Sequence, residues 1–172
     1  MLKKIGEYQL KILDKSLMER KKDEILELLK LIPNSHYTLE DILGEKKGER
    51  VLYGKWEYSL VLLDKERVVR VLIGYERERE ESKLYSENCF YINEVAISRE
   101  LKGKGLGRSL LRYFIDNLKC YKYLDGDLII RIQTTNRVEN IKVIELYEEL
   151  GFKKVGTKDY PTKQDLILEI RR

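Results

Sequence analysis

Residues 99–114, RELKGKGLGRSLLRYF, place three glycines at alternate positions directly before a strongly amphipathic helical pattern. The glycines are Gly103, Gly105 and Gly107, and basic residues stand between and beside them. Glycine adopts positive φ angles and lets a ligand approach the backbone closely. Successive amides in such a turn form an anion-binding concavity, to which the positive end of the following helix contributes. The stretch therefore predicts a phosphate or pyrophosphate site where a strand turns into a helix.

Two common nucleotide-binding motifs do not fit this stretch. A P-loop requires GxxxxGK[ST], which is absent from the sequence. A dinucleotide-binding fold requires GxGxxG near the start of a βαβ unit, whereas the spacing here is GxGxG after a series of predicted strands. A glycine-rich turn whose basic residues are exposed by chance is the structural alternative.

Hydrophobic periodicity predicts one mixed-sheet α/β domain over residues 1–172. The expected strands are 7–13, a hairpin over 57–80 with its turn at 64–67, 89–98, 127–134, 152–157 and 165–171. The expected helices are 16–33, 38–46, 106–118 and 137–150. The element order is β-α-α-β-β-β-α-β-α-β-β, without an internal repeat or a linker.

Capping residues set the ends of two of these helices. Ser16 and Glu19 have the spacing of a capping box, and Pro33 is expected to end the same helix. Gly151 follows the helix over 137–150 and precedes Phe152, which is the sequence pattern of a Schellman motif.

The strand over 89–98 interrupts an apolar face with a carboxylate. Simple alternation places Phe90, Ile92, Glu94 and Ala96 on one face and Tyr91, Asn93, Val95 and Ile97 on the other. Glu94 on an otherwise apolar face points either into an active-site cleft or towards solvent at the strand end.

Composition excludes several classes of protein. Charged residues make up 37% of the chain but leave a net charge of only +4, which argues against a dedicated nucleic-acid binder. A single histidine, His36, and two cysteines without a CxxC spacing, Cys89 and Cys120, leave little material for a metal site, so none is expected. We find no run of 18 apolar residues and no signal-peptide pattern, and we therefore expect a soluble cytoplasmic protein that does not enter membranes.

Two motifs resemble those of the GNAT superfamily of acyl-CoA-dependent N-acyltransferases. The run from Lys102 to Gly107, KGKGLG, resembles the family's signature loop [Q/R]-x-x-G-x-[G/A], with lysine at the first position. The run from Asn140 to Phe152 is similar to the family's helix N-x-x-A-x-x-[LF]-Y-x-x-x-G-F, with Val143 in place of alanine. The resemblance covers essentially the whole chain and implies the GNAT fold, a single mixed, mostly antiparallel sheet flanked by helices.

The resemblance also implies how acetyl-CoA is held as the cosubstrate. The pyrophosphate is expected at Lys102, Gly103, Lys104, Gly105, Leu106, Gly107 and Arg108. The pantetheine arm is expected to pair like an added strand with the backbone of Val95, Ala96 and Ile97, and to contact Asn140.

The chemistry implied is direct attack of an amine on a thioester. The sequence carries no GxSxG pattern and no Cys/His nucleophile arrangement, in keeping with a reaction that needs no covalent enzyme intermediate. By resemblance Tyr147 is the general acid for the leaving thiolate, because a phenol carries its proton at neutral pH. Glu94 is the candidate base, with water as the alternative. Some protein-acetylating relatives use a glutamate on the next strand, where this chain has Arg131.

The acceptor is expected to be a primary amine, either a protein N-terminus or a small molecule. Residues 158–163, KDYPTK, resemble the tyrosine-bearing loop of enzymes that acetylate protein N-termini. A non-catalytic CoA-binding sensor or interaction module of the same fold is the alternative function. The acyl-chain preference and a homodimeric state are left open by the sequence.

Overall fold

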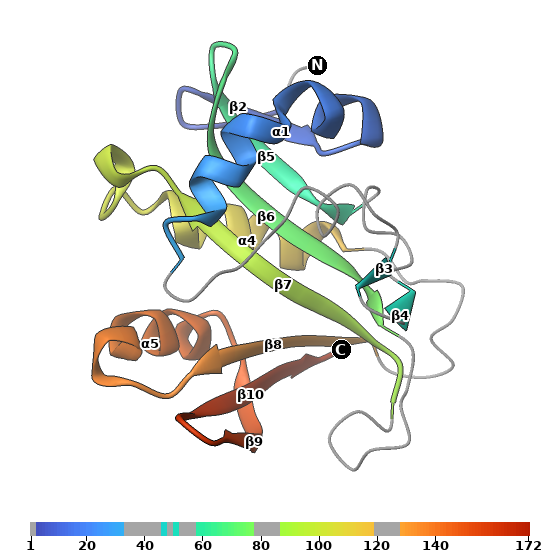
Figure 1. The fold of residues 1–172 in the computed structure, drawn as a ribbon, viewed down its shortest axis with the longest axis vertical. Coiled ribbons are helices and arrows are strands. Elements are labelled where there is room, and N and C mark those ends of the chain that lie inside the picture. The colour runs from blue at the N-terminus through green and yellow to red at the C-terminus, as the bar shows by residue number, and fades with distance from the viewer. Residues whose placement is uncertain (1–2, 33–45, 48–49, 52–57, 78–86, 119–127) are drawn as a thin grey trace.

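The computed structural model describes residues 3–32, 46–47, 50–51, 58–77, 87–118 and 128–172 (Figure 1). The strands are β1 (Lys4–Ile5), β2 (Tyr8–Ile12), β3 (Lys46–Lys47), β4 (Arg50–Val51), β5 (Leu60–Asp64), β6 (Arg67–Arg77), β7 (Cys89–Ile97), β8 (Ile129–Thr135), β9 (Lys153–Tyr160) and β10 (Lys163–Arg171). The α-helices are α1 (Lys15–Leu29), α4 (Leu106–Asn117) and α5 (Ile141–Glu149), and 3-10 turns span Arg99–Leu101 and Val138–Asn140.

Eight strands form one sheet in the order β1-β2-β5-β6-β7-β8-β10-β9. Neighbouring strands are antiparallel except β7 and β8, which are parallel. The expectation of a mixed, mostly antiparallel sheet is therefore confirmed. The helix expected at 38–46 and Cys120 fall outside the described residues, apart from Lys46, which lies in β3.

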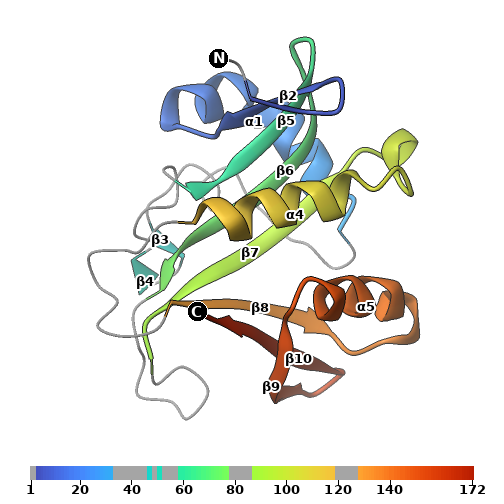
Figure 2. The same ribbon diagram turned by 180° about the vertical axis from the view of Figure 1, so that it is seen from behind.

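Helices cover both faces of the sheet. Helix α1 packs through Leu17 and Ile25 on one face, against a group that includes Val71. Helices α4 and α5 pack on the other face, where Leu110 and Tyr147 share one core. Figure 2 shows α4 crossing in front of the strands on this second face. In the described part of the chain, no helix has both the length and the apolar character required to cross a lipid bilayer.

Helix ends match the sequence at one position and differ at another. The expected Schellman motif is present: the Gly151 amide donates to the Glu148 carbonyl (2.9 Å) and the Phe152 amide to the Tyr147 carbonyl (3.0 Å). The expected capping box at Ser16 is wrong. The N-cap of helix α1 is Asp14, two positions before Ser16, and its Oδ1 accepts a hydrogen bond from the Leu17 amide at 2.7 Å.

A β-bulge in β7 overturns the expected alternation. Along β6, Ile73 pairs with Glu94 but the next residue, Gly74, pairs with Ile92, so Asn93 is the extra residue. Phe90, Ile92, Val95 and Ile97 consequently face α4 and α5, while Ala96 faces α1. Glu94 pairs with Ile73, a residue of the α1-facing core. The bulge therefore separates Glu94 from Phe90 and Ile92, with which simple alternation grouped it.

Candidate active site

The parallel strands β7 and β8 part in the middle of the sheet. Their ladder joins Phe90 with Ile130, Tyr91 with Arg131 and Ile92 with Ile132. Beyond this point β7 continues to Ile97 and β8 to Thr135, and the two ribbons diverge (Figure 2). Val95, Ala96 and Ile97 thus lie on a length of β7 that pairs with β6 on one side and with no described strand on the other. This edge is where an extended ligand could pair with the backbone.

The glycine-rich loop connects the end of β7 to helix α4. Gly103 and Gly105 both have positive φ, +81° and +73°, and Gly105 is the N-cap of α4. The amides of the first helical turn, Leu106 to Arg108, have no carbonyl partner within the helix. Lys102 and Lys104 are exposed beside them. The loop therefore has the geometry and the charge of an anion site, as its sequence predicts.

Arg108, expected among the cofactor-binding residues, forms an ion pair with Glu149. Because Arg108 lies in the first turn of α4 and Glu149 in the last turn of α5, the pair joins the two helices next to the loop. Both side chains are about half exposed, and the charge of Arg108 already has a partner.

Arg70, on β6, was not singled out from the sequence. Its guanidinium lies under the first turn of α4: a β-carbon on Gly107 would be only 2.7 Å from Nη2 and 3.1 Å from Nη1. Arg70 is 6% exposed, and its Nε has no hydrogen-bond partner. The third glycine of the motif is therefore the one that leaves room for a buried guanidinium. The signal in the sequence was an arginine within an otherwise apolar strand, VVRVLI.

Tyr147 lies on α5 in the core between that helix and the sheet. It is 7% exposed, and its ring packs edge-on against Phe152 at 5.8 Å between centroids. Burial raises the pKa of the Tyr147 phenol, the negative charge of Glu94 raises it further, and the positive charge of Arg70 lowers it. The phenol therefore keeps its proton at neutral pH. Glu94 on β7 and Arg70 on β6 are thus both close enough to Tyr147 on α5 to shift the pKa of its phenol.

Glu94 and Tyr147 approach the opening from opposite sides of the sheet. Glu94 is half-buried on the bulged part of β7 and shares the α1 side with its partner Ile73. Tyr147 belongs to the core on the α4 and α5 side. A group placed between β7 and β8 would therefore have a carboxylate on one side and a phenol on the other.

Asn140 occupies the N-cap position of α5. Its Nδ2 donates to the carbonyl of Thr135 at 2.9 Å, which ties the start of the helix to the end of β8. Asn136, between β8 and α5, donates instead to Gln164 Oε1 at 3.1 Å. Asn140 thus lies beside the opening, and one hydrogen of its amide is already used.

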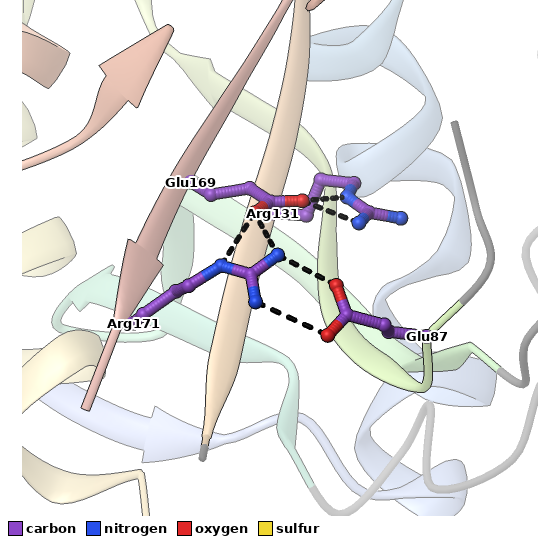
Figure 3. Close-up of polar contacts among 4 residues, drawn as sticks. All are labelled: Glu87, Arg131, Glu169 and Arg171. Atoms are coloured by element: carbon purple, nitrogen blue, oxygen red, sulfur yellow. Dashed lines mark hydrogen bonds and ion pairs between the residues drawn. The ribbon is translucent and has the colours of Figure 1, made fainter. Parts of the chain in front are cut away.

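Arg131 belongs to an ion-pair network between β8 and β10 (Figure 3). Its Nε donates to Glu169 Oε1 at 2.6 Å, and both side chains are almost fully buried. Arg171 joins Glu169 to Glu87, which precedes β7, with Nη2 to Glu87 Oε2 at 2.6 Å. Arg131 therefore has a structural role, at the position where the resemblance implies a glutamate acting as the catalytic base in some relatives.

Tyr160, at the end of β9, belongs to a polar cluster with Gln133 and Asp165. The Tyr160 hydroxyl accepts from Gln133 Nε2 at 2.9 Å, and the same nitrogen donates to Asp165 Oδ2 at 2.7 Å. Asp165 is 4% exposed, and its Oδ1 has no hydrogen-bond partner. Asp165 alternates with Leu166, which faces α4 and α5, so it points to the same side of the sheet as Glu94. The hairpin tyrosine expected from the KDYPTK run is thus on the Glu94 side.

Comparison with known proteins shows the family and the fold of the chain. Residues 23–152 match the family model described as Acetyltransferase (GNAT) family. The ribosomal-protein-S18-alanine N-acetyltransferase from Escherichia coli is 17% identical, with a TM-score of 0.67 over 95% of this chain and 93% of that chain. The NatC complex bound to Gag peptide and CoA gives 19% identity and a TM-score of 0.70 over 96% and 99%.

A plant structure is similar to the same extent. Naa50 from Arabidopsis thaliana, in complex with the bisubstrate analogue CoA-Ac-MVNAL, is 13% identical, with a TM-score of 0.66 over 95% of this chain and 98% of that chain. At such identities the structural similarity shows a common fold only. The assignment of the chain to a family rests on the match to the family model.

Proposed function

Because the chain belongs to the acetyltransferase (GNAT) family, we propose that it transfers the acetyl group of acetyl-CoA to the nitrogen of a primary amine. The observation that carries this proposal is the convergence of Tyr147 and Glu94 at the opening between β7 and β8. Tyr147 acts as the general acid and Glu94 as the base, directly or through water.

The described residues fit the cofactor. The amides of the glycine loop and of the first turn of α4 suit a pyrophosphate, and Lys102 and Lys104 add exposed positive charge. The unpaired edge of β7 from Val95 to Ile97 suits the amide-containing pantetheine arm. Asn140, at the start of α5 and bonded to the end of β8, is proposed to contact the same arm.

Each residue then has a defined part in the reaction. Glu94 accepts the proton that the amine must lose as its nitrogen bonds to the acetyl carbon. A backbone amide of β7, at Ala96 or a neighbour, donates to the carbonyl oxygen as negative charge develops on it. Tyr147 donates its proton to the sulfur as the carbon–sulfur bond breaks. The same burial disfavours a free thiolate beside Tyr147. It therefore raises the pKa of the leaving thiol together with the pKa of the phenol.

The acceptor side favours an amine of low pKa. A protein α-amino group has a pKa of about 7.7–8.0, so a good fraction is neutral at pH 7. A lysine side chain, near 10.4, needs about 2.5 units more help, or about 3.4 kcal/mol. Position 131 holds an arginine paired with Glu169, so it supplies no second carboxylate to act as a strongly tuned base. The named relatives that act on alanine or carry peptides point the same way. We propose a protein N-terminus or a small amine as the acceptor.

Mass spectrometry of paired peptides tests the proposal. One peptide has a free N-terminus and a blocked lysine, and its partner has a blocked N-terminus and a free lysine. Acetyl transfer from acetyl-CoA to the first peptide, or to members of a panel of small amines, is the expected result. Transfer confined to the lysine side chain would contradict the acceptor class. Binding of acetyl-CoA without transfer to any amine would favour the non-catalytic CoA-binding module.

A further inference from the structure

The buried guanidinium of Arg70 has no negative partner among the described residues. Arg70 pairs through its backbone with Ile97, the last residue of β7, and its side chain extends on the α4 side to Gly107. Burial lowers the pKa of Arg70 to about 10, which still leaves it charged at neutral pH. Tyr147 would raise the pKa of Arg70 only as a phenolate, and its phenol is neutral at pH 7, so it supplies no negative charge to Arg70.

The position of this charge is unfavourable in the absence of a ligand. The N-terminus of a helix carries partial positive charge, and the guanidinium of Arg70 lies against the second residue of α4. A buried cation that lacks a partner is costly, and the adjacent helix end increases the cost. Arg108, in the first turn of α4, has Glu149 as its partner, whereas no acidic residue in the described part of the chain pairs with Arg70.

We propose that Arg70 is the buried counter-charge of the pyrophosphate of acetyl-CoA, so that the cofactor supplies the negative partner that none of the described residues provides. The inference rests on the proposed function, since it takes acetyl-CoA as the ligand of the glycine loop. An anion at the amides of the first turn of α4 would lie next to the guanidinium across Gly107, and the guanidinium itself is almost fully buried. The attraction is therefore screened less than that of the exposed Lys102 and Lys104.

This role makes an unusual pair of predictions for removal of the charge. Arg70→Met keeps a long side chain in the core but removes the buried cation. The variant should therefore be more stable than the wild type without ligand, its Tm rising by about 2 °C or more. Its affinity for acetyl-CoA should fall about tenfold or more, because a charge-assisted interaction is lost. A residue with a purely structural role would instead lose stability when replaced.

The experiment measures apo Tm by calorimetry and the Kd of acetyl-CoA by titration in four variants. Arg70→Lys retains the charge and should retain most of the affinity, whereas Arg70→Gln retains hydrogen bonding alone and should bind as weakly as Arg70→Met. Arg67→Met is the matched control: it makes the same change in net charge on the same strand, at an exposed arginine paired with Glu100 at 2.8 Å. It should leave the affinity unchanged.

The outcomes separate this inference from the proposed function. If wild-type protein does not bind acetyl-CoA, the proposed function fails, while the apo Tm of Arg70→Met still reports whether the buried charge is uncompensated. If the wild type binds and Arg70→Met binds equally well, the counter-charge role is wrong. It is also wrong if Arg70→Gln binds like the wild type, or if Arg70→Met lowers the apo Tm.

Discussion

Glu94 and Tyr147 are coupled across the sheet: the negative charge of Glu94 adds to burial in raising the pKa of the Tyr147 phenol. The coupling joins a bulged strand to a helix that packs on the opposite face. Glu94 lies on β7 beyond the last residue that pairs with β8.

Tyr147→Phe should lower kcat by about 10²-fold or more, because the hydroxyl is the proposed proton donor to sulfur. The ring contact with Phe152 is retained, so affinity for acetyl-CoA and stability should change little. Initial rates together with titration calorimetry measure both quantities. Tyr113→Phe is the control, since it removes a phenol from α4 that accepts a hydrogen bond from Lys3 at 2.6 Å. Wild-type turnover in Tyr147→Phe, with chemistry limiting the rate, would remove Tyr147 from the mechanism.

Glu94→Gln should change the pH dependence of kcat/KM. The amide keeps the shape of the side chain but cannot accept a proton. The variant should be most impaired near neutral pH and should recover at alkaline pH, where the amine is neutral without help. Rates across a pH series measure this, with Glu100→Gln as the control at an exposed carboxylate beyond the end of β7. A loss of equal size at every pH would indicate a structural role for Glu94.

Gly105→Val should abolish binding of acetyl-CoA without unfolding the protein. Gly105 has φ +73°, a conformation that a β-branched residue adopts only with strain, so the loop amides must move. Gly6→Val is a close control because Gly6 also has a positive φ, +59°, with open space around its β-carbon position, in the turn between β1 and β2. Both variants should lose stability to a similar degree, about 1–3 kcal/mol. Equal affinity in folded Gly105→Val and wild type would contradict the assignment of the loop.

Glu87→Gln should lower the free energy of unfolding near neutral pH but not in acid. The hydrogen bond from Arg171 lowers the pKa of Glu87 below its ordinary value. A lowered pKa means that the contribution is present above the unfolded-state pKa and is lost as the pH falls through the folded-state pKa. Because both side chains are about half exposed, the loss at pH 7 should be only about 0.2–1 kcal/mol.

Urea denaturation of Glu87→Gln and wild type over a pH series measures this contribution. The difference in the free energy of unfolding should shrink once the pH lies below the folded-state pKa of Glu87. A difference that stays constant from neutral to acid pH would mean that the carboxylate charge is not its source.

Features set by neighbouring residues could be predicted from the sequence. The positive φ at Gly103 and Gly105 follows from glycine spacing, and the Schellman motif follows from Gly151 and Phe152. The start of α1 could not be fixed in this way, because Asp14 and Ser16 are both good caps two positions apart. Only the path of the chain decides that Asp14 reaches the Leu17 amide.

Features set by distant contacts escaped the sequence. Alternation in β7 assumed one residue for each partner on β6, and the bulge at Asn93 becomes visible only when the two strands are aligned. The importance of Arg70 depends on Gly107 lying above it, although the two are far apart in the chain. An arginine within an apolar strand indicates a buried charge, but the sequence does not identify the residues that lie around it.

The short ladder between β7 and β8 also bears on how the protein opens. Among the described residues, three backbone pairs of the ladder connect the group β1, β2, β5, β6 and β7 to the group β8, β10 and β9. Each group can therefore behave as a separate cooperative unit in native-state hydrogen exchange. Acetyl-CoA bound along the β7 edge and in contact with α5 would touch both units and hold them together. We therefore expect bound acetyl-CoA to slow amide exchange in β9 and β10, far from the glycine loop, as well as at the loop itself.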